Sequence, residues 1–106
     1  VAAPVEAVAG PATRLLGDSV LVVPVAGLER LAAAVMAVTA EVGEPPEDRP
    51  FLGHLTLCRF RDEPPSGAVG AAVSATFRVD EVVLVRSRTL PGGAVHDVLE
   101  RFQLAA

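Results

Sequence analysis

Residues 51–60 read Phe-Leu-Gly-His-Leu-Thr-Leu-Cys-Arg-Phe, and polar residues alternate with apolar ones in the middle of this stretch. Alternation with a period of two is typical of a β-strand, on which every second side chain lies on the same face. We therefore predict a strand over residues 54–60 with His54 and Thr56 on one face, about 6.6–6.8 Å apart along the strand. At that spacing an imidazole and a hydroxyl can reach a single group of the size of a phosphate.

Two apolar patterns upstream predict a buried strand and a long helix. Residues 20–25 form a continuous apolar run with the length of a buried strand. Pro24 cannot donate a hydrogen bond to a ladder, so we expect it at the end of this strand or on a sheet edge. An apolar stripe with helical spacing predicts a helix that begins at Gly27 and ends near Gly43, before Pro45-Pro46. The stripe consists of Leu28, Leu31, Val35, Val38 and Val42.

The remaining segments complete a mainly antiparallel arrangement. Shorter patterns predict a strand over 5–8, a turn at 10–11, a loop over 61–67, a single long strand over 77–87 with a bulge at 80–81, a turn at 91–93 and a final antiparallel strand over 94–104. Residues 67–75 fit either a short helix or irregular structure. This order predicts an α+β fold, a mainly antiparallel sheet with one long packed helix, in a single domain of residues 1–106.

The composition restricts the class of protein. Apolar residues make up 51% of the 106 residues, enough for one modest core. No apolar run approaches the roughly 18 residues of a membrane span, so we expect a soluble protein that does not contact a membrane. A net charge of −4 argues against binding duplex DNA, which needs many cationic contacts. Cys58 is the only cysteine, so no internal disulfide can form, and we expect a reducing, cytoplasmic location.

Other side chains are weaker candidates for chemistry. By alternation Cys58 falls on the same face as His54, which suggests a cysteine nucleophile activated by a histidine. Four residues of strand separate the two by about 13 Å, too far for proton transfer, so we exclude this pair. His96 is interpreted as a surface or structural residue. The sequence shows no metal-ligand spacing and no glycine-rich phosphate loop, and we expect no metal and no cofactor.

The pattern His54-x-Thr56-x, with Arg59 closely following, resembles the signature of the 2H phosphoesterase superfamily. The similarity is greatest to its RNA 2′,3′-cyclic phosphodiesterases, often labelled 2′-5′ RNA ligases. Flanking segments extend the resemblance to the entry of that family's second motif and to its closing hairpin. These segments are Arg49-Pro50-Phe51, residues 77–82, Arg86-Ser87, residues 91–93 and residues 98–102.

The resemblance implies a function, a substrate and roles for three residues. His54 and Thr56 would have catalytic and phosphate-binding roles, and Arg59 would lie near the substrate phosphate. The implied activity is metal-independent opening of a 2′,3′-cyclic phosphate on an RNA terminus or a small cyclic nucleotide; ligation, its reverse, is not separated from it. Members of this family have a two-lobed fold with one His-x-Thr motif in each lobe. This chain begins at Val1 and carries one motif, so we expect the C-terminal part of a longer domain: one lobe and part of the other.

The implied chemistry follows from in-line attack at phosphorus. A base must take a proton from the entering water and an acid must give one to the leaving oxygen, on opposite sides of the phosphorus. An imidazole suits either task, because it exchanges protons near neutral pH, but one imidazole cannot perform both in one step. A threonine hydroxyl can donate to a non-bridging oxygen whose charge grows in the transition state. With one motif, the chain alone is expected to be inactive.

The sequence is compatible with several alternatives. Strict alternation directs Arg59 away from His54 and Thr56, so a role at the phosphate requires a twist, a bulge or the end of the strand; otherwise Arg59 is an ordinary surface arginine. A second hypothesis for the chain is a degenerate module that binds a nucleotide or phosphate without turnover. A third is a structural or interaction protein with no site, which burial of His54 away from any pocket would favour. The pattern also departs from the family in that His96 occupies a position where tyrosine is common. A single lobe leaves apolar sheet surface uncovered, so we expect the chain alone either to self-associate, as a two-fold homodimer, or to be poorly soluble.

Overall fold

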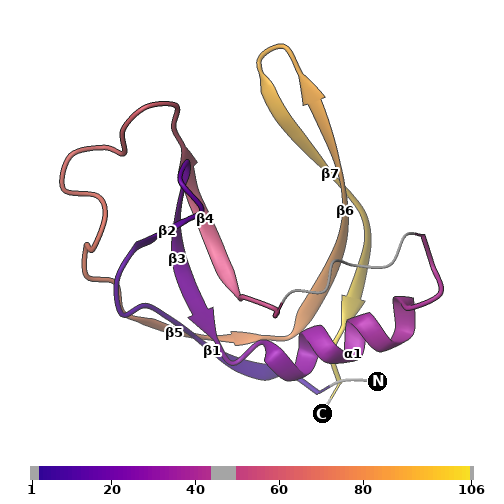
Figure 1. The fold of residues 1–106 in the computed structure, drawn as a ribbon. Coiled ribbons are helices and arrows are strands. Elements are labelled where there is room, and N and C mark those ends of the chain that lie inside the picture. Colours follow the sequence, from indigo (N-terminus) through magenta and orange to yellow (C-terminus); the bar gives the residue numbers. More distant parts are fainter. Residues whose placement is uncertain (1–2, 44–49, 106) are drawn as a thin grey trace. The chain divides into compact units, whose positions relative to one another are not determined.

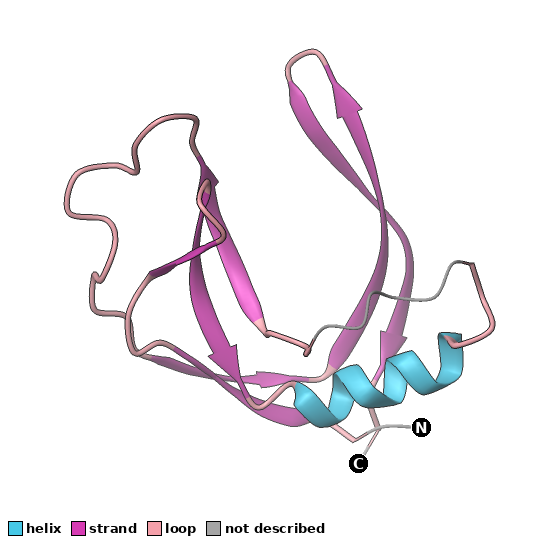
Figure 2. Cartoon of the chain, viewed as in Figure 1, coloured by secondary structure: helices cyan, strands magenta, loops and turns pink. Residues whose placement is uncertain are grey.

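The computed structural model describes residues 3–43 and 50–105. The predicted helix stop at Pro45-Pro46 and the contribution of Arg49 to the motif's entry lie outside the described residues. Within the described ranges the protein is mostly antiparallel sheet with one helix, so the α+β class is confirmed (Figures 1 and 2). No helix in these ranges has the length and the hydropathy that crossing a lipid bilayer requires.

The chain forms two compact units, the first from Val5 to Arg78 and the second mainly from Val79 onward. The expectation that residues 1–106 form a single domain remains a prediction. The first unit holds a five-stranded sheet and the helix, and the second holds a two-stranded hairpin. The strands of the sheet are β1 (Val5–Ala9), β2 (Arg14–Leu16), β3 (Val20–Ala26), β4 (His54–Arg59) and β5 (Ala75–Val79), in the order β2-β3-β1-β5 with β4 paired to β3.

Strand β3 is the centre of the sheet, as the apolar run over 20–25 predicts. Its first residues pair with β2 and its last residues pair with β1, while β4 lies along its other side (Figure 1). All three pairings are antiparallel. Partners on both sides leave this strand little contact with water, and most of the buried apolar residues come from it. The buried apolar set is Ala7, Ala9, Leu21, Val22, Val23, Val25 and Leu31.

The expected position of Pro24 at a strand end or edge is wrong. Pro24 lies inside β3, between the residues paired with β2 and those paired with β1. The carbonyl of Pro24 accepts a hydrogen bond from the Gly10 amide at 3.0 Å. The nitrogen of Pro24 faces the same side of β3 as this carbonyl, at the point where β1 ends and β2 begins. A central strand therefore tolerates this proline because no partner carbonyl needs a donor there.

Helix α1 (Glu29–Thr39) confirms the predicted helix but is shorter. Its C-cap residue is Ala40, three positions before the expected stop at Gly43. The apolar stripe is buried at its beginning only: Leu31 is 9% exposed, whereas Val38 is 81% exposed. The helix therefore packs through its first turns, and the expectation of a fully packed stripe is wrong for its second half.

The predicted long strand over 77–87 is divided in the structure. It is interrupted at Asp80 into β5 and β6 (Glu81–Leu90), which belong to different sheets. Aspartate fits a pleated ladder poorly, and the carbonyl of Asp80 instead accepts a hydrogen bond from the Leu104 amide at 2.8 Å. Strand β6 pairs antiparallel with β7 (Gly93–Gln103) through a turn at residues 91–92, which confirms the predicted closing hairpin.

Strand β2 was not expected from the sequence. Residues 67–75, whose sequence fits either a short helix or irregular structure, are irregular up to residue 74 and run beside the chain that leads into β2. The Thr13 hydroxyl donates to the Ala68 carbonyl and accepts from the Ala71 amide at 3.0 Å. These two bonds bury Thr13 and place the start of β2 on the flank of the sheet.

Candidate functional site

Strand β4 carries the three residues that the sequence singles out. In its ladder with β3, His54 lies opposite Pro24 and Thr56 lies opposite Val22. The register then shifts by one, so that Cys58, and not residue 57, lies opposite Leu21. Leu57 is therefore the extra residue of a β-bulge. The strand ends two residues later, at Arg59.

The bulge determines which face Arg59 occupies. Arg59 lies opposite Val20, and residues directly opposite each other in an antiparallel pair share a face. Val20 and Val22 are alternate residues of β3 and lie on the same face, as does Pro24. Arg59 consequently shares a face with His54 and Thr56. We call this the His54 face. Of the three ways in which Arg59 could reach it, a twist, a bulge or the end of the strand, the register shows a bulge.

The same shift corrects the expected position of Cys58. Regular alternation places it with His54, but opposite Leu21 it lies on the other face of the sheet. It is half-buried there. The pair of Cys58 and His54 is thus excluded by face as well as by distance.

The His54 side chain is exposed and its ring is held by the main chain. Its Nδ1 lies 2.8 Å from the Leu52 carbonyl oxygen, which can only accept a hydrogen bond. The hydrogen is therefore on Nδ1, and in the neutral ring Nε2 carries a free lone pair. An imidazole in this form can accept a proton through Nε2. The burial of His54 that would favour a structural or interaction protein is thus not found.

Gly53 fixes the backbone from which His54 projects. Its carbonyl accepts from the Val25 amide at 2.8 Å, and the residue is buried. A Cβ on Gly53 would collide with the Val25 carbonyl oxygen and would lie 3.4 Å from Cδ1 of Leu28, at the start of α1. Side chains alternate along the strand, so the helix side of the sheet is opposite to the His54 face at this point. Thr56 and Arg59 are also exposed.

A further basic residue lies on the same face. Arg14, in β2, pairs with Val22, which pairs in turn with Thr56. Arg14, Val22 and Thr56 therefore form one row across three strands, with their side chains on the His54 face. Sequence reasoning missed Arg14, because a three-residue strand is too short for its alternation to be recognised.

A hollow of about 570 Å³ also lies in the first unit, where the chain turns between β1 and β2. Neither His54 nor Thr56 contributes to its lining, which is mainly apolar. Val8 and Ala26, which pair with each other on the His54 face, are part of it. The lining residues are Val8, Ala9, Gly10, Pro11, Ala26, Ala72, Val73 and Ser74.

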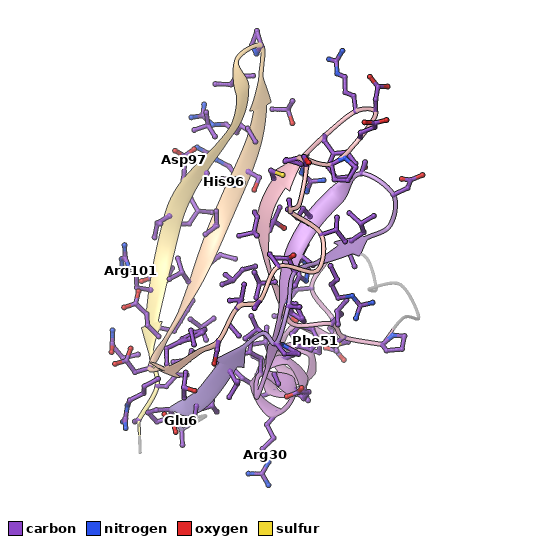
Figure 3. All side chains as sticks on the ribbon, turned by 90° about the vertical axis from the view of Figure 1, so that its left-hand side faces the viewer. Glu6, Arg30, Phe51, His96, Asp97 and Arg101 are labelled. Atoms are coloured by element: carbon purple, nitrogen blue, oxygen red, sulfur yellow. The ribbon has the colours of Figure 1, made fainter. Side chains whose placement is uncertain are left out.

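The second histidine belongs to the hairpin of the second unit (Figure 3). Nδ1 of His96 lies 2.8 Å from Oγ of Ser87, its cross-strand partner, and the imidazole is exposed. On the other face of the hairpin, Asp97 forms ion pairs with Arg86 at 3.5 Å and Arg88 at 3.0 Å. The interpretation of His96 as a surface residue agrees with its exposure.

Comparison of the sequence with protein families and with curated proteins gives no match. Among solved structures, the protein is similar to TT0787 of Thermus thermophilus, known from a crystal structure. The two share 30% sequence identity with a TM-score of 0.81, and the match covers 98% of this chain and 62% of TT0787. The chain thus spans less than two thirds of the length of this relative, and the likeness supports a common fold.

Proposed function

We propose that the full-length protein is a 2H phosphoesterase that opens 2′,3′-cyclic phosphates on RNA termini or small nucleotides without a metal. The observation that carries this proposal is the bulge at Leu57, which brings His54, Thr56 and Arg59 to one exposed face of β4. A chance His-x-Thr sequence would not require the arginine to share that face. The common face is what a single phosphate contacted by all three side chains would need.

Each of the three side chains has a task in the proposed reaction. Nε2 of His54 exchanges a proton with an oxygen that enters or leaves phosphorus, while the Nδ1 contact with Leu52 holds the ring. The Thr56 hydroxyl donates to a non-bridging oxygen. Arg59 offers a planar, permanently charged donor group to the same phosphate. Together they stabilise the negative charge that grows on the equatorial oxygens in the transition state.

The second proton-transfer group is proposed to come from another part of the protein. In the family that the sequence resembles, this group belongs to a first His-x-Thr motif in a second lobe. We propose that residues 1–106 form one lobe and part of the other. The share of TT0787 that the match covers, 62%, supports this, because a protein of this fold has room for a second motif outside the matched part.

Hydrolysis of a nucleoside 2′,3′-cyclic phosphate by the full-length protein tests the proposal. We expect turnover in the presence of a chelator. His54→Ala should reduce kcat/KM at least about 100-fold, the usual contribution of an acid or base, and Thr56→Ala should reduce it less, because only one neutral donor is lost. A correctly folded His54→Ala protein that retains full activity would contradict the assignment.

A module that binds without turnover is the second candidate, and the presence of one His-x-Thr motif in the chain favours it. Calorimetric titration with a nucleoside 2′-phosphate and a nucleoside 3′-phosphate separates the two functions. Binding that is lost in Thr56→Ala, together with no detectable hydrolysis by the unaltered protein, would support the binding module. Hydrolysis that depends on His54 would exclude it.

A further inference from the structure

Arg14 is a basic residue of the His54 face for which the proposed reaction has no use. It is exposed, and within the described residues it forms no ion pair. This distinguishes it from Arg86, Arg88 and Arg101 of the hairpin, each of which contacts a carboxylate. A guanidinium that contacts no carboxylate of the described residues can bind an anion from solution.

The register places Arg14 at a defined distance from the candidate phosphate site. Neighbouring strands are about 4.7–4.9 Å apart, so the backbones of Arg14 and Thr56 are separated by about 9.5 Å across β3. Val22 lies between them, and its short side chain is completely buried. The aliphatic part of Arg14 can extend over Val22 while its charged end stays in water.

Charge on this face is mainly positive, although the whole chain carries −4. Among the residues of β1 to β4 that register and alternation place there, the charged ones are Arg14, Arg59 and Glu6. Glu6 lies two residues before Val8 in β1, beyond the rows of β3 that hold Thr56 and Arg59. Arg14 and Arg59 therefore occupy adjacent rows of the face, with no carboxylate of these strands between them.

We propose that Arg14 binds the phosphodiester that precedes the terminal cyclic phosphate, and that it thereby selects oligonucleotide ends over mononucleotides. This inference rests on the proposed function. His54 and Arg59 lie one row to either side of Thr56 on β4, each about 6.6–6.8 Å from it along the strand, and these three suffice for the reacting phosphate. Arg14 is two strands away, about 9.5 Å from Thr56. Consecutive phosphates of an RNA strand are separated by a ribose. An RNA strand that runs along the row from Thr56 toward Arg14 therefore places its second phosphate beyond Val22. A mononucleoside cyclic phosphate has no second charge to place there.

A pair of substrates tests this proposal in the full-length protein. One is a nucleoside 2′,3′-cyclic phosphate and the other is a dinucleotide that ends in the same cyclic phosphate. Arg14→Ala should lower kcat/KM for the dinucleotide about tenfold, mainly through KM, and change that for the mononucleotide less than twofold. Arg14→Lys, which keeps the charge but not the planar fork, should recover part of the loss.

Arg30→Ala is the matched control. Arg30 is an exposed residue of α1 whose side chain projects away from the ribbon (Figure 3). This variant removes the same charge, so it corrects for a general electrostatic effect, and both substrates should be turned over as before. Circular dichroism verifies folding, and Arg14→Gln, which keeps most of the aliphatic stem, replaces Arg14→Ala if the latter is unfolded.

The outcomes separate this inference from the proposed function. An equal loss for both substrates, or no loss for the dinucleotide, would overturn the role of Arg14 while hydrolysis stands. If the unaltered protein hydrolyses neither substrate, the proposed function fails, and binding of a dinucleotide 3′-phosphate and a mononucleotide 3′-phosphate decides the role of Arg14 instead. A preference for the dinucleotide that disappears in Arg14→Ala supports it, and equal affinities overturn it.

Discussion

Strands β3 and β4 are hydrogen-bonded neighbours and both are rich in valine or leucine, yet they have opposite surroundings. Four of the seven residues of β3 are buried, whereas no residue of β4 is. Within the described part of the chain, β4 pairs on one side only. The comparison shows that position in the sheet, more than composition, separates the strand that forms the core from the strand that carries the candidate site. A strand with one free side can also hold a bulge, because no second ladder has to follow its register.

The largest expected difference between the two strands concerns stability. Leu21 in β3 is 4% exposed, and Leu55 in β4 is 51% exposed, on the same face of the sheet. Leu21→Ala should lower the free energy of unfolding by about 2–5 kcal/mol, since it removes buried methyl groups and leaves a cavity. Leu55→Ala should cost less than about 1 kcal/mol. Urea denaturation measures both, and similar losses would mean that β4 is covered in solution.

Deletions in β4 give the next effect, and they test the bulge directly. Deleting Leu57, the extra residue, leaves every pairing with β3 in place, so His54, Thr56 and Arg59 keep their common face. We expect kcat/KM for the cyclic phosphate to change less than about threefold. Deleting Leu55 instead moves Thr56 to the opposite face from His54, because one residue of register reverses the faces.

Leu55 and Leu57 are matched in type and in exposure, 51% and 53%. Deletion of Leu55 should cost about tenfold or more in kcat/KM, the effect of losing a hydrogen bond to a charged group. Equal sensitivity to the two deletions would contradict the register derived for β4.

The smallest effect is expected for Cys58. It lies opposite Leu21 on the face away from His54, so Cys58→Ala should change kcat/KM less than twofold. A loss comparable to that of His54→Ala would place the thiol at the reacting phosphate. That result would restore regular alternation and remove the bulge from the account of β4.

The parts of the fold that the sequence predicts correctly have local signals. The apolar run of β3, the helical stripe that begins at Leu28 and the turn at 91–92 are recognisable without knowledge of any partner. Strand β2 has only three residues and forms because β3 offers it a ladder. The interruption at Asp80 separates two sheets, and it too depends on which strands pair with β5 and β6. The early end of α1 and the exposure of Val38 depend on what the rest of the fold provides for packing.

In the candidate site, too, a local sequence pattern predicts the position of some residues and not of others. Alternation alone places His54 and Thr56 together, because they are two residues apart in one strand. The face of Arg59 depends on an extra residue between it and Thr56, and a bulge is visible only when β4 is aligned with β3. The face of Cys58 is misjudged for the same reason. Arg14 lies on the His54 face through two cross-strand pairings, which no local pattern contains.

The contact between the His54 ring and the Leu52 carbonyl has a consequence for mutational robustness. The acceptor belongs to the main chain, so any amino acid at position 52 supplies the same oxygen. Sequence drift at this exposed position can therefore proceed without disturbing the ring. The constraint on sequence falls on position 53 instead, because only glycine fits there between the Val25 carbonyl and Leu28. Selection for an oriented imidazole would act on the one residue of this segment that has no side chain.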